Sequence, residues 1–160
     1  MNRSTAFLLS GLSGFVTLSH ELLWYRVVAF SSGNAAPSFA LLLGLYLTGL
    51  AIGSEYVGRA TSRKTKKFVP LAVLILLGNV LAFLTVPFIS VLVSVGAPLL
   101  LALGVVVLTA AVLGTQFPLI CHLSIPPDER VGENLSFLYV AHIIGAGLGS
   151  LLTGLVLMNV

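Results

Sequence analysis

The chain has 160 residues, of which 58% are hydrophobic and only 8% are charged, with a formal net charge of +3. An average soluble domain has about 25% charged residues, so this chain has too few charges to cover the surface of a water-soluble globule. The composition excludes a soluble enzyme domain, a disordered chain and a nucleic-acid-binding module, and the single Cys121 excludes a disulfide scaffold. It predicts an all-α, polytopic transmembrane helix bundle.

The first apolar segment begins near the N-terminus and resembles the start of a signal peptide. Arg3 precedes the apolar residues from Ala6 onward, as in a short basic region. No cleavage site of the A-x-A type follows, and the apolar stretch continues past Phe15. This segment is therefore predicted to be a retained first span rather than a cleaved signal.

Five segments are long and apolar enough to cross the roughly 30 Å hydrocarbon core of a bilayer. The run over 99–113 does not alternate as a barrel strand would, so the spans are predicted to be helices. Pro118 is expected to kink the fourth span, and the turn over 91–97 is the least distinct boundary. The predicted single transmembrane domain, 1–160, has spans at about 6–30, 37–57, 68–90, 98–120 and 135–158.

Basic residues between the second and third spans predict the orientation. Lysine and arginine accumulate in cytoplasmic loops, and five of the eight cations lie in this one linker. The N-terminus is therefore predicted to be cytoplasmic and Val160 external, in a bacterial inner membrane. The linker is also expected to contact anionic lipid headgroups through Arg59, Arg63, Lys64, Lys66 and Lys67.

Charged side chains inside the first span form the strongest candidate site. Glu21 and Arg26 are costly in lipid, so both should face protein or water. One interpretation is a site for a polar or cationic substrate, with an amine drawn to the carboxylate and held on an aromatic face. The other is an interfacial anchor with a snorkelling arginine. The candidate substrate-binding residues are His20, Glu21, Trp24, Tyr25 and Arg26.

The histidines of the first and fifth spans are predicted to be packed and hydrogen-bonded, although His20 could also couple protons. Neither His20 nor His142 has further ligands at metal spacing, so no metal or other cofactor is expected. An intramembrane enzyme would need Glu21 and His142 to converge, but the predicted spans place them at different depths. No catalytic residues are therefore assigned.

Small residues recur at four-residue spacing in the second and fifth spans. Such spacing lets the backbones of two helices approach closely in a membrane. In the fifth span, two neighbouring ridges of small residues predict packing on two sides, either static or as a sliding interface. The predicted helix-packing residues are Gly49, Gly53, Gly145, Gly149, Ser150 and Gly154.

Four segments in order carry a resemblance to a known family: SGLSG (10–14) leading into ELLWYR (21–26); LTGLAIGS (47–54) with GR (58–59); LGTQFPL (113–119); and Gly132 followed by LYVAHIIGAGLGS (138–150). Together they resemble the membrane domain of bacterial spermidine-synthase-like proteins, the fused major-facilitator-like/spermidine synthase family, and they cover nearly the whole chain. In the fourth segment, His142 stands where the family often has Asn.

The resemblance implies a membrane module that transports or binds a polyamine or another small polar cation. Family members commonly continue into an aminopropyltransferase domain, whose catalytic residues are not found within these 160 residues. The alternative is a structural anchor that assembles a partner enzyme such as an aminopropyltransferase. Besides the lipid bilayer, the expected partner is a second copy of the chain or another subunit, and no nucleic acid.

Overall fold

The computed structural model describes residues 2–32, 35–62, 71–96, 98–127 and 130–157. These residues form helices joined by short turns, and no strand occurs among them. The helices are α1 (Arg3–Ser32), α2 (Ala35–Ser62), α3 (Leu71–Ser94), α4 (Leu99–Gly114), α5 (Gln116–Ser124), α6 (Val131–Leu152) and a short π-helix, η1 (Thr153–Leu157).

The predicted all-α bundle with five spans is confirmed for the described part of the chain. Five helical segments are long and apolar enough to cross a membrane. The fifth begins at Val131 rather than 135, because Glu133 in its first turn suits the positive end of the helix dipole. The segments are Arg3–Phe30, Pro37–Thr61, Leu71–Ser94, Leu100–Ser124 and Val131–Val156.

The connection between the third and fourth spans is shorter than predicted. Residues 91–94 continue α3, and the chain then reverses through a tight turn. Gly96 has φ of +69°, which glycine adopts without steric cost, and its amide donates to the Val93 carbonyl at 3.1 Å. The predicted loop over 91–97 is therefore mostly helix, and Ala97 lies outside the described residues.

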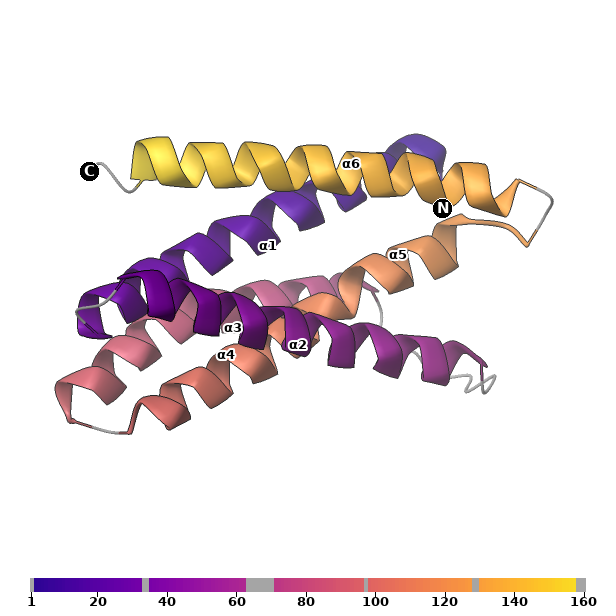
Figure 1. Cartoon of the computed structure of the whole chain (residues 1–160). Coiled ribbons are helices and arrows are strands. Elements are labelled where there is room, and N and C mark those ends of the chain that lie inside the picture. The colour runs from indigo at the N-terminus through magenta and orange to yellow at the C-terminus, as the bar shows by residue number, and fades with distance from the viewer. Residues whose placement is uncertain (1, 33–34, 63–70, 97, 128–129, 158–160) are drawn as a thin grey trace.

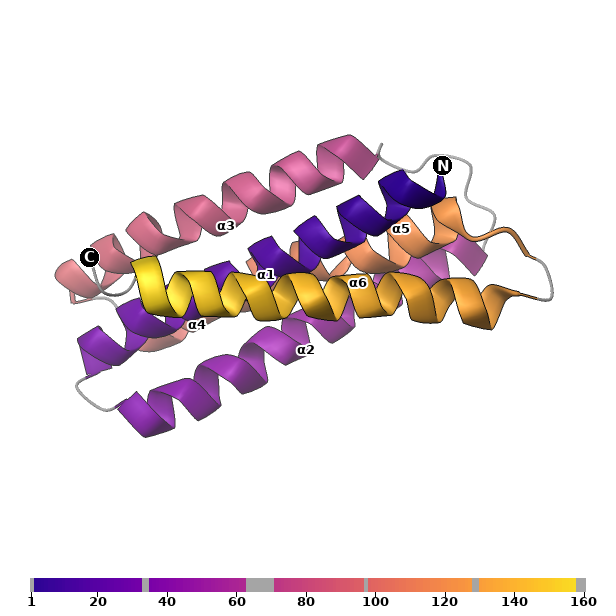
Figure 2. The same ribbon diagram turned by 90° about the horizontal axis from the view of Figure 1, so that it is seen from above.

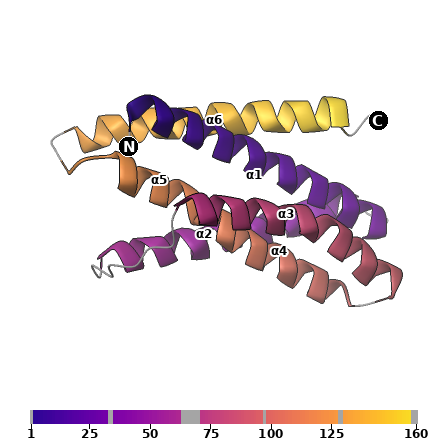
Figure 3. The ribbon, with the colours of Figure 1, turned by 180° about the vertical axis from the view of Figure 1, so that it is seen from behind.

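The fourth span is broken into two helices at Thr115. Pro118 has no N–H to donate to the Gly114 carbonyl, four residues earlier, and its ring displaces that turn of the helix. At the break, the Thr115 amide donates to the Val112 carbonyl, three residues earlier, at 3.2 Å. The predicted proline kink thus takes the form of a break at Thr115 between α4 and α5, which follow one another in Figure 3.

Two closely packed helix pairs organise the bundle. α6 crosses α1 along its length, and α2 and α3 lie on opposite sides of α1 (Figures 1 and 2). A Cβ atom on Gly145 or Gly149 would collide with an α1 backbone carbonyl, that of Gly11 or Phe15. In the second pair, a Cβ on Gly53 of α2 would collide with an α4 backbone carbonyl. Both pairs therefore depend on glycine for backbone contact.

A dry core lies where α1, α2, α3 and α4 meet. Trp24, Leu42, Tyr46, Ile89 and Val106 are almost completely buried there. Large apolar side chains such as Leu and Phe are exposed along the outer faces of all the spans, as expected for surfaces that face lipid.

The orientation of the bundle remains a prediction that accessibility labelling can check. Thr61 lies beside the basic linker and Ser94 at the opposite end of the next helix. Thr61→Cys and Ser94→Cys, each with Cys121→Ser, are to be treated with a membrane-impermeant maleimide in intact bacterial cells. The cysteine at position 94 is expected to be labelled in intact cells. The cysteine at position 61 is expected to be labelled only after the cells are lysed. The reverse pattern would place the linker outside the cell.

Candidate functional site

A cleft of about 650 Å³ lies between α2 and α6, with α1 and α5 forming its floor. Leu47 on α2 and Tyr139 on α6 line it and are 53% and 54% exposed, so the cleft is open between these two helices. Most of its wall is apolar. The apolar wall consists of Leu18, Leu22, Phe39, Leu43, Leu47, Leu50, Ala51, Leu113, Gly114, Phe117 and Pro118.

A stripe of polar side chains on α1 faces this cleft. Ser13, Thr17 and Glu21 follow each other at four-residue intervals, which places them on one face of the helix. All three line the cleft and are buried. The Ser13 hydroxyl donates to Oε1 of Gln116 at 3.2 Å, and the Thr17 hydroxyl donates to the Ser13 carbonyl at 2.5 Å. The first two members of the stripe are thus satisfied within the protein.

Glu21 differs from the other two members of the stripe. Its side chain is only 6% exposed, yet no hydrogen bond or ion pair joins its carboxyl to another of the residues that the structure describes. Among the described residues, Glu21 interacts electrostatically with Tyr46 on α2. A carboxyl group at membrane depth without such a partner is energetically unfavourable unless a ligand supplies one.

Tyr46 is the second unsatisfied group of the cleft. Its side chain is 1% exposed, and its hydroxyl has no hydrogen-bond partner in the described structure. The Tyr46 ring packs edge-on against Trp24, with a centroid distance of 6.2 Å, and Tyr46 is among the residues that line the cleft. The site therefore brings together two polar groups that neither bond to each other nor to a described neighbour.

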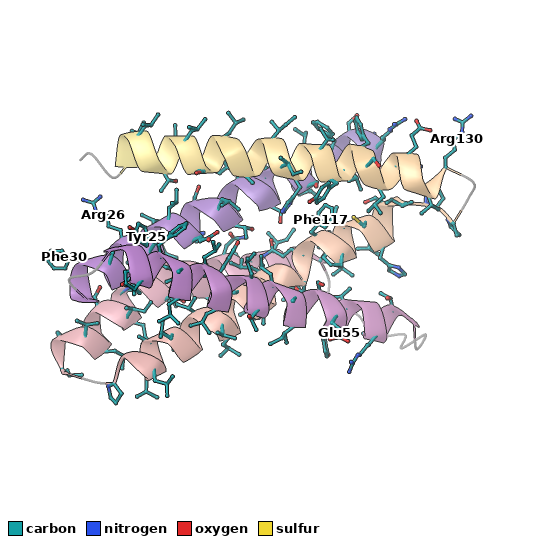
Figure 4. The ribbon with its side chains drawn as sticks, viewed as in Figure 1. Tyr25, Arg26, Phe30, Glu55, Phe117 and Arg130 are labelled. Carbon is teal, nitrogen blue, oxygen red and sulfur yellow. The ribbon has the colours of Figure 1, made fainter. Side chains whose placement is uncertain are left out.

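His142 closes the other end of the cleft as a packed residue. Its Nδ1 lies 3.1 Å from the Ser10 carbonyl oxygen, so this nitrogen carries the hydrogen, and its ring packs at a tilt against Phe117, with 4.8 Å between the ring centroids. Figure 4 shows Phe117 on the side of α5 that faces α6. Ser10 and Glu21 are separated by roughly 16 Å along α1, so His142 and Glu21 line one cleft at different levels.

The structure brings only one of the five predicted substrate-binding residues into the cleft. Trp24 is fully buried, and its Nε1 donates to the Ala82 carbonyl of α3 at 3.2 Å, so it is a core residue and not an aromatic-belt residue. Tyr25 packs edge-on against Phe39 at 5.3 Å. His20 is half-buried, with its Nδ1–H 2.8 Å from the Val16 carbonyl oxygen.

Arg26 is not among the residues that line the cleft, and Figure 4 shows it near Phe30 at one end of the bundle. It lines a separate apolar pocket of about 390 Å³ between α1 and α3, with Phe30 and Val93. Arg26 therefore does not share with Glu21 the cleft described here, and its role in binding stays a prediction. The five positions that separate the two residues correspond to about 140° around the helix, which explains the divergence.

The predicted packing and headgroup residues separate into groups. Gly49, Gly53, Gly145 and Gly149 lie against the backbone or Cβ atoms of neighbouring helices. Gly154 does not mediate close packing, because a Cβ there would meet no atom within 4 Å, and Ser150 lines the cleft instead. Arg59 is exposed and pairs with Glu55 at 2.6 Å (Glu55 is labelled in Figure 4). The remaining predicted headgroup residues, Arg63, Lys64, Lys66 and Lys67, lie outside the described residues.

Tyr46, Phe117 and Tyr139 are cleft residues that the sequence did not single out. The polar residues of their helices do not form one stripe beside them, so the sequence gives no clear sign of which side is turned inward. A signal was available on α1, where three polar residues recur every fourth position within an apolar span. Within the described part of the chain, no group of three or more His, Cys, Asp or Glu side chains is positioned to hold a metal ion.

Comparison of the chain with protein-family models, with curated proteins and with solved structures finds no match. The cleft is therefore interpreted from its own chemistry.

Proposed function

We propose that this chain is a membrane module that binds a small organic cation, an amine, in the cleft between α2 and α6. The observation that carries the proposal is the buried carboxyl of Glu21, which lacks a partner among the described residues. An acidic residue inside a membrane helix costs up to about 2.5–3.5 kcal/mol on insertion scales, the value for the helix centre, and such residues usually mark a substrate or ion path.

The surroundings of Glu21 suit a cation. None of the described residues that line the cleft is a lysine or arginine, so the carboxylate has no competing internal counter-charge. The Tyr46 ring lies nearby, and aromatic faces attract ammonium groups by about 0.5–2 kcal/mol. A bound ammonium would neutralise Glu21 and provide a donor for the Tyr46 hydroxyl oxygen.

The resemblance to spermidine-synthase-like membrane domains supports an amine as the ligand. In this proposal the chain is the membrane component of such a protein in a bacterial inner membrane, and it carries or presents an amine. Because the cleft is open on one side, a second copy of the chain or a partner subunit would be needed to enclose a transport path.

The proposal is tested by equilibrium binding of tritiated butylamine, octylamine and spermidine to the purified protein in phosphatidylcholine nanodiscs. Glu21→Gln keeps the size of the side chain and removes its charge. We expect at least a tenfold loss of affinity for whichever amines bind, since a charged hydrogen bond contributes about 1.5–3 kcal/mol. Glu55→Gln, which removes an exposed carboxylate at the end of α2, is the matched control and should bind as the parent does.

Two results would contradict the proposal. Either no amine binds the parent protein, or Glu21→Gln binds all three amines as tightly as the parent does. In both cases the cleft has no role in cation binding, and the anchoring of a partner enzyme becomes the better explanation of the chain.

A further inference from the structure

The charges that line the cleft restrict the kind of amine it can accept. Resting on the proposed function above, we infer that the ligand is a primary amine with one ammonium group on an apolar body, rather than a polyvalent polyamine. The inference comes from the number of carboxylates, the hydrogen-bond acceptors around them and the nature of the remaining wall.

Glu21 is the only acidic side chain among the described residues that line the cleft. A polyamine such as spermidine would place one ammonium group against Glu21 and its other charges against leucine and phenylalanine side chains. Transfer of an unpaired charge from water to such surroundings is strongly unfavourable, and no second carboxylate lines the described cleft to offset it. The cleft can therefore neutralise one positive charge of a bound ligand.

The polar groups around Glu21 favour an ammonium with N–H donors. The Glu21 carboxylate and the Tyr46 hydroxyl oxygen are both acceptors without partners in the described structure. A primary ammonium has three donors, a number sufficient for both acceptors. A quaternary ammonium has the same charge but no donor, and would leave the tyrosine oxygen unsatisfied.

The apolar wall determines the rest of the ligand. Leu22, Leu43, Leu47 and Leu50 line the cleft, and the rim at Leu47 and Tyr139 is exposed between α2 and α6. An alkyl or aryl tail can lie on this wall and extend toward the lipid. Burial of each additional methylene is expected to raise affinity, relative to the amine in water, by up to about fourfold.

The experiment compares ligands on the unmodified protein, so it does not depend on a variant that folds. Octylamine, spermidine, octyltrimethylammonium and octanol compete with tritiated octylamine on the protein in phosphatidylcholine nanodiscs, with protein-free nanodiscs as the background. We expect octylamine to bind at least tenfold more tightly than each of the other three. Butylamine should bind more weakly than octylamine by a factor that grows with the number of methylenes removed.

Variants then connect this preference to the two acceptors. Tyr46→Phe removes only the hydroxyl, and it should weaken octylamine binding several-fold while leaving octyltrimethylammonium binding unchanged. Glu21→Gln should weaken binding of both cations and leave octanol binding unchanged. A variant that weakens octanol equally would show damage to the cleft as a whole and would contradict the assigned roles.

The outcomes separate this inference from the proposed function. If spermidine binds as tightly as octylamine, or more tightly, and depends on Glu21, the cleft binds amines but the inference of a single charge is wrong. If octyltrimethylammonium equals octylamine, the assignment of N–H donors is wrong. If no amine binds in a Glu21-dependent manner, both the inference and the proposed function are wrong.

Discussion

Gly145→Ala is expected to be among the most damaging single substitutions in this chain. A Cβ at this position would collide with the backbone of α1 at Gly11, whose carbonyl carbon and Cα would lie 2.6 and 2.9 Å away. Backbone atoms cannot rotate aside as a side chain can, so α1 and α6 would have to separate along their crossing. We expect the free energy of unfolding to fall by about 3 kcal/mol, which is the upper end of the range for overpacked sites. Unfolding in mixed micelles by sodium dodecyl sulfate, followed by circular dichroism, measures it.

Gly147→Ala is the matched control, two residues further along the same helix. A Cβ at Gly147 would meet no atom within 4 Å, and the position is exposed. Alanine is the better helix former by about 1 kcal/mol, so this variant should be neutral or slightly more stable. Equal destabilisation by the two substitutions would show that α1 and α6 are not in backbone contact at Gly145.

Trp24→Ala should cost about 3–5 kcal/mol, the range for deletion of a large aromatic side chain from a packed core. Trp24 is completely buried, donates a hydrogen bond to the Ala82 carbonyl and supports the Tyr46 ring from behind. The same denaturation experiment measures the loss in the free energy of unfolding. Circular dichroism is the signal, because Trp24 is the only tryptophan and its removal abolishes tryptophan fluorescence.

The comparison for Trp24→Ala is Phe30→Ala, at the end of the same helix. Phe30 is 92% exposed, so its truncation removes almost no packing, and a change within about 0.5 kcal/mol is expected. An interfacial tryptophan would instead make the two substitutions similar in effect. That result would show that Trp24 lies at the membrane interface and does not hold the Tyr46 ring in place.

The outline of this fold follows from the sequence because hydropathy and length are properties of single segments. Five spans and the bend caused by Pro118 could be predicted in this way. The pairing of helices could not, since Gly49 and Gly145 indicate that some backbone comes close without indicating which one. The direction in which a residue faces was also hidden. Trp24 looks like a residue of the aromatic belt until Ala82 and Tyr46 are seen around it.

The cleft shows the same limit at the level of function. Glu21 could be identified from the sequence because a charged residue inside an apolar span is rare. Tyr46 could not, because it lies in an apolar helix, 25 positions after Glu21 in the chain, and only the packing of α2 beside α1 brings the two together. Of the residues predicted to share a site with Glu21 on its own helix, none lines the cleft.

The close pairing of α1 with α6 also has a consequence for biosynthesis. The glycine-containing face of α1, at Gly11 and Gly14, is covered by α6, whose contacting residues are made more than 100 positions later. Until α6 has been synthesised, α1 must remain in the membrane with this face uncovered. The nascent protein therefore depends on whatever shields α1 during that interval, and a chain that stops before α6 is exposed to quality-control proteases.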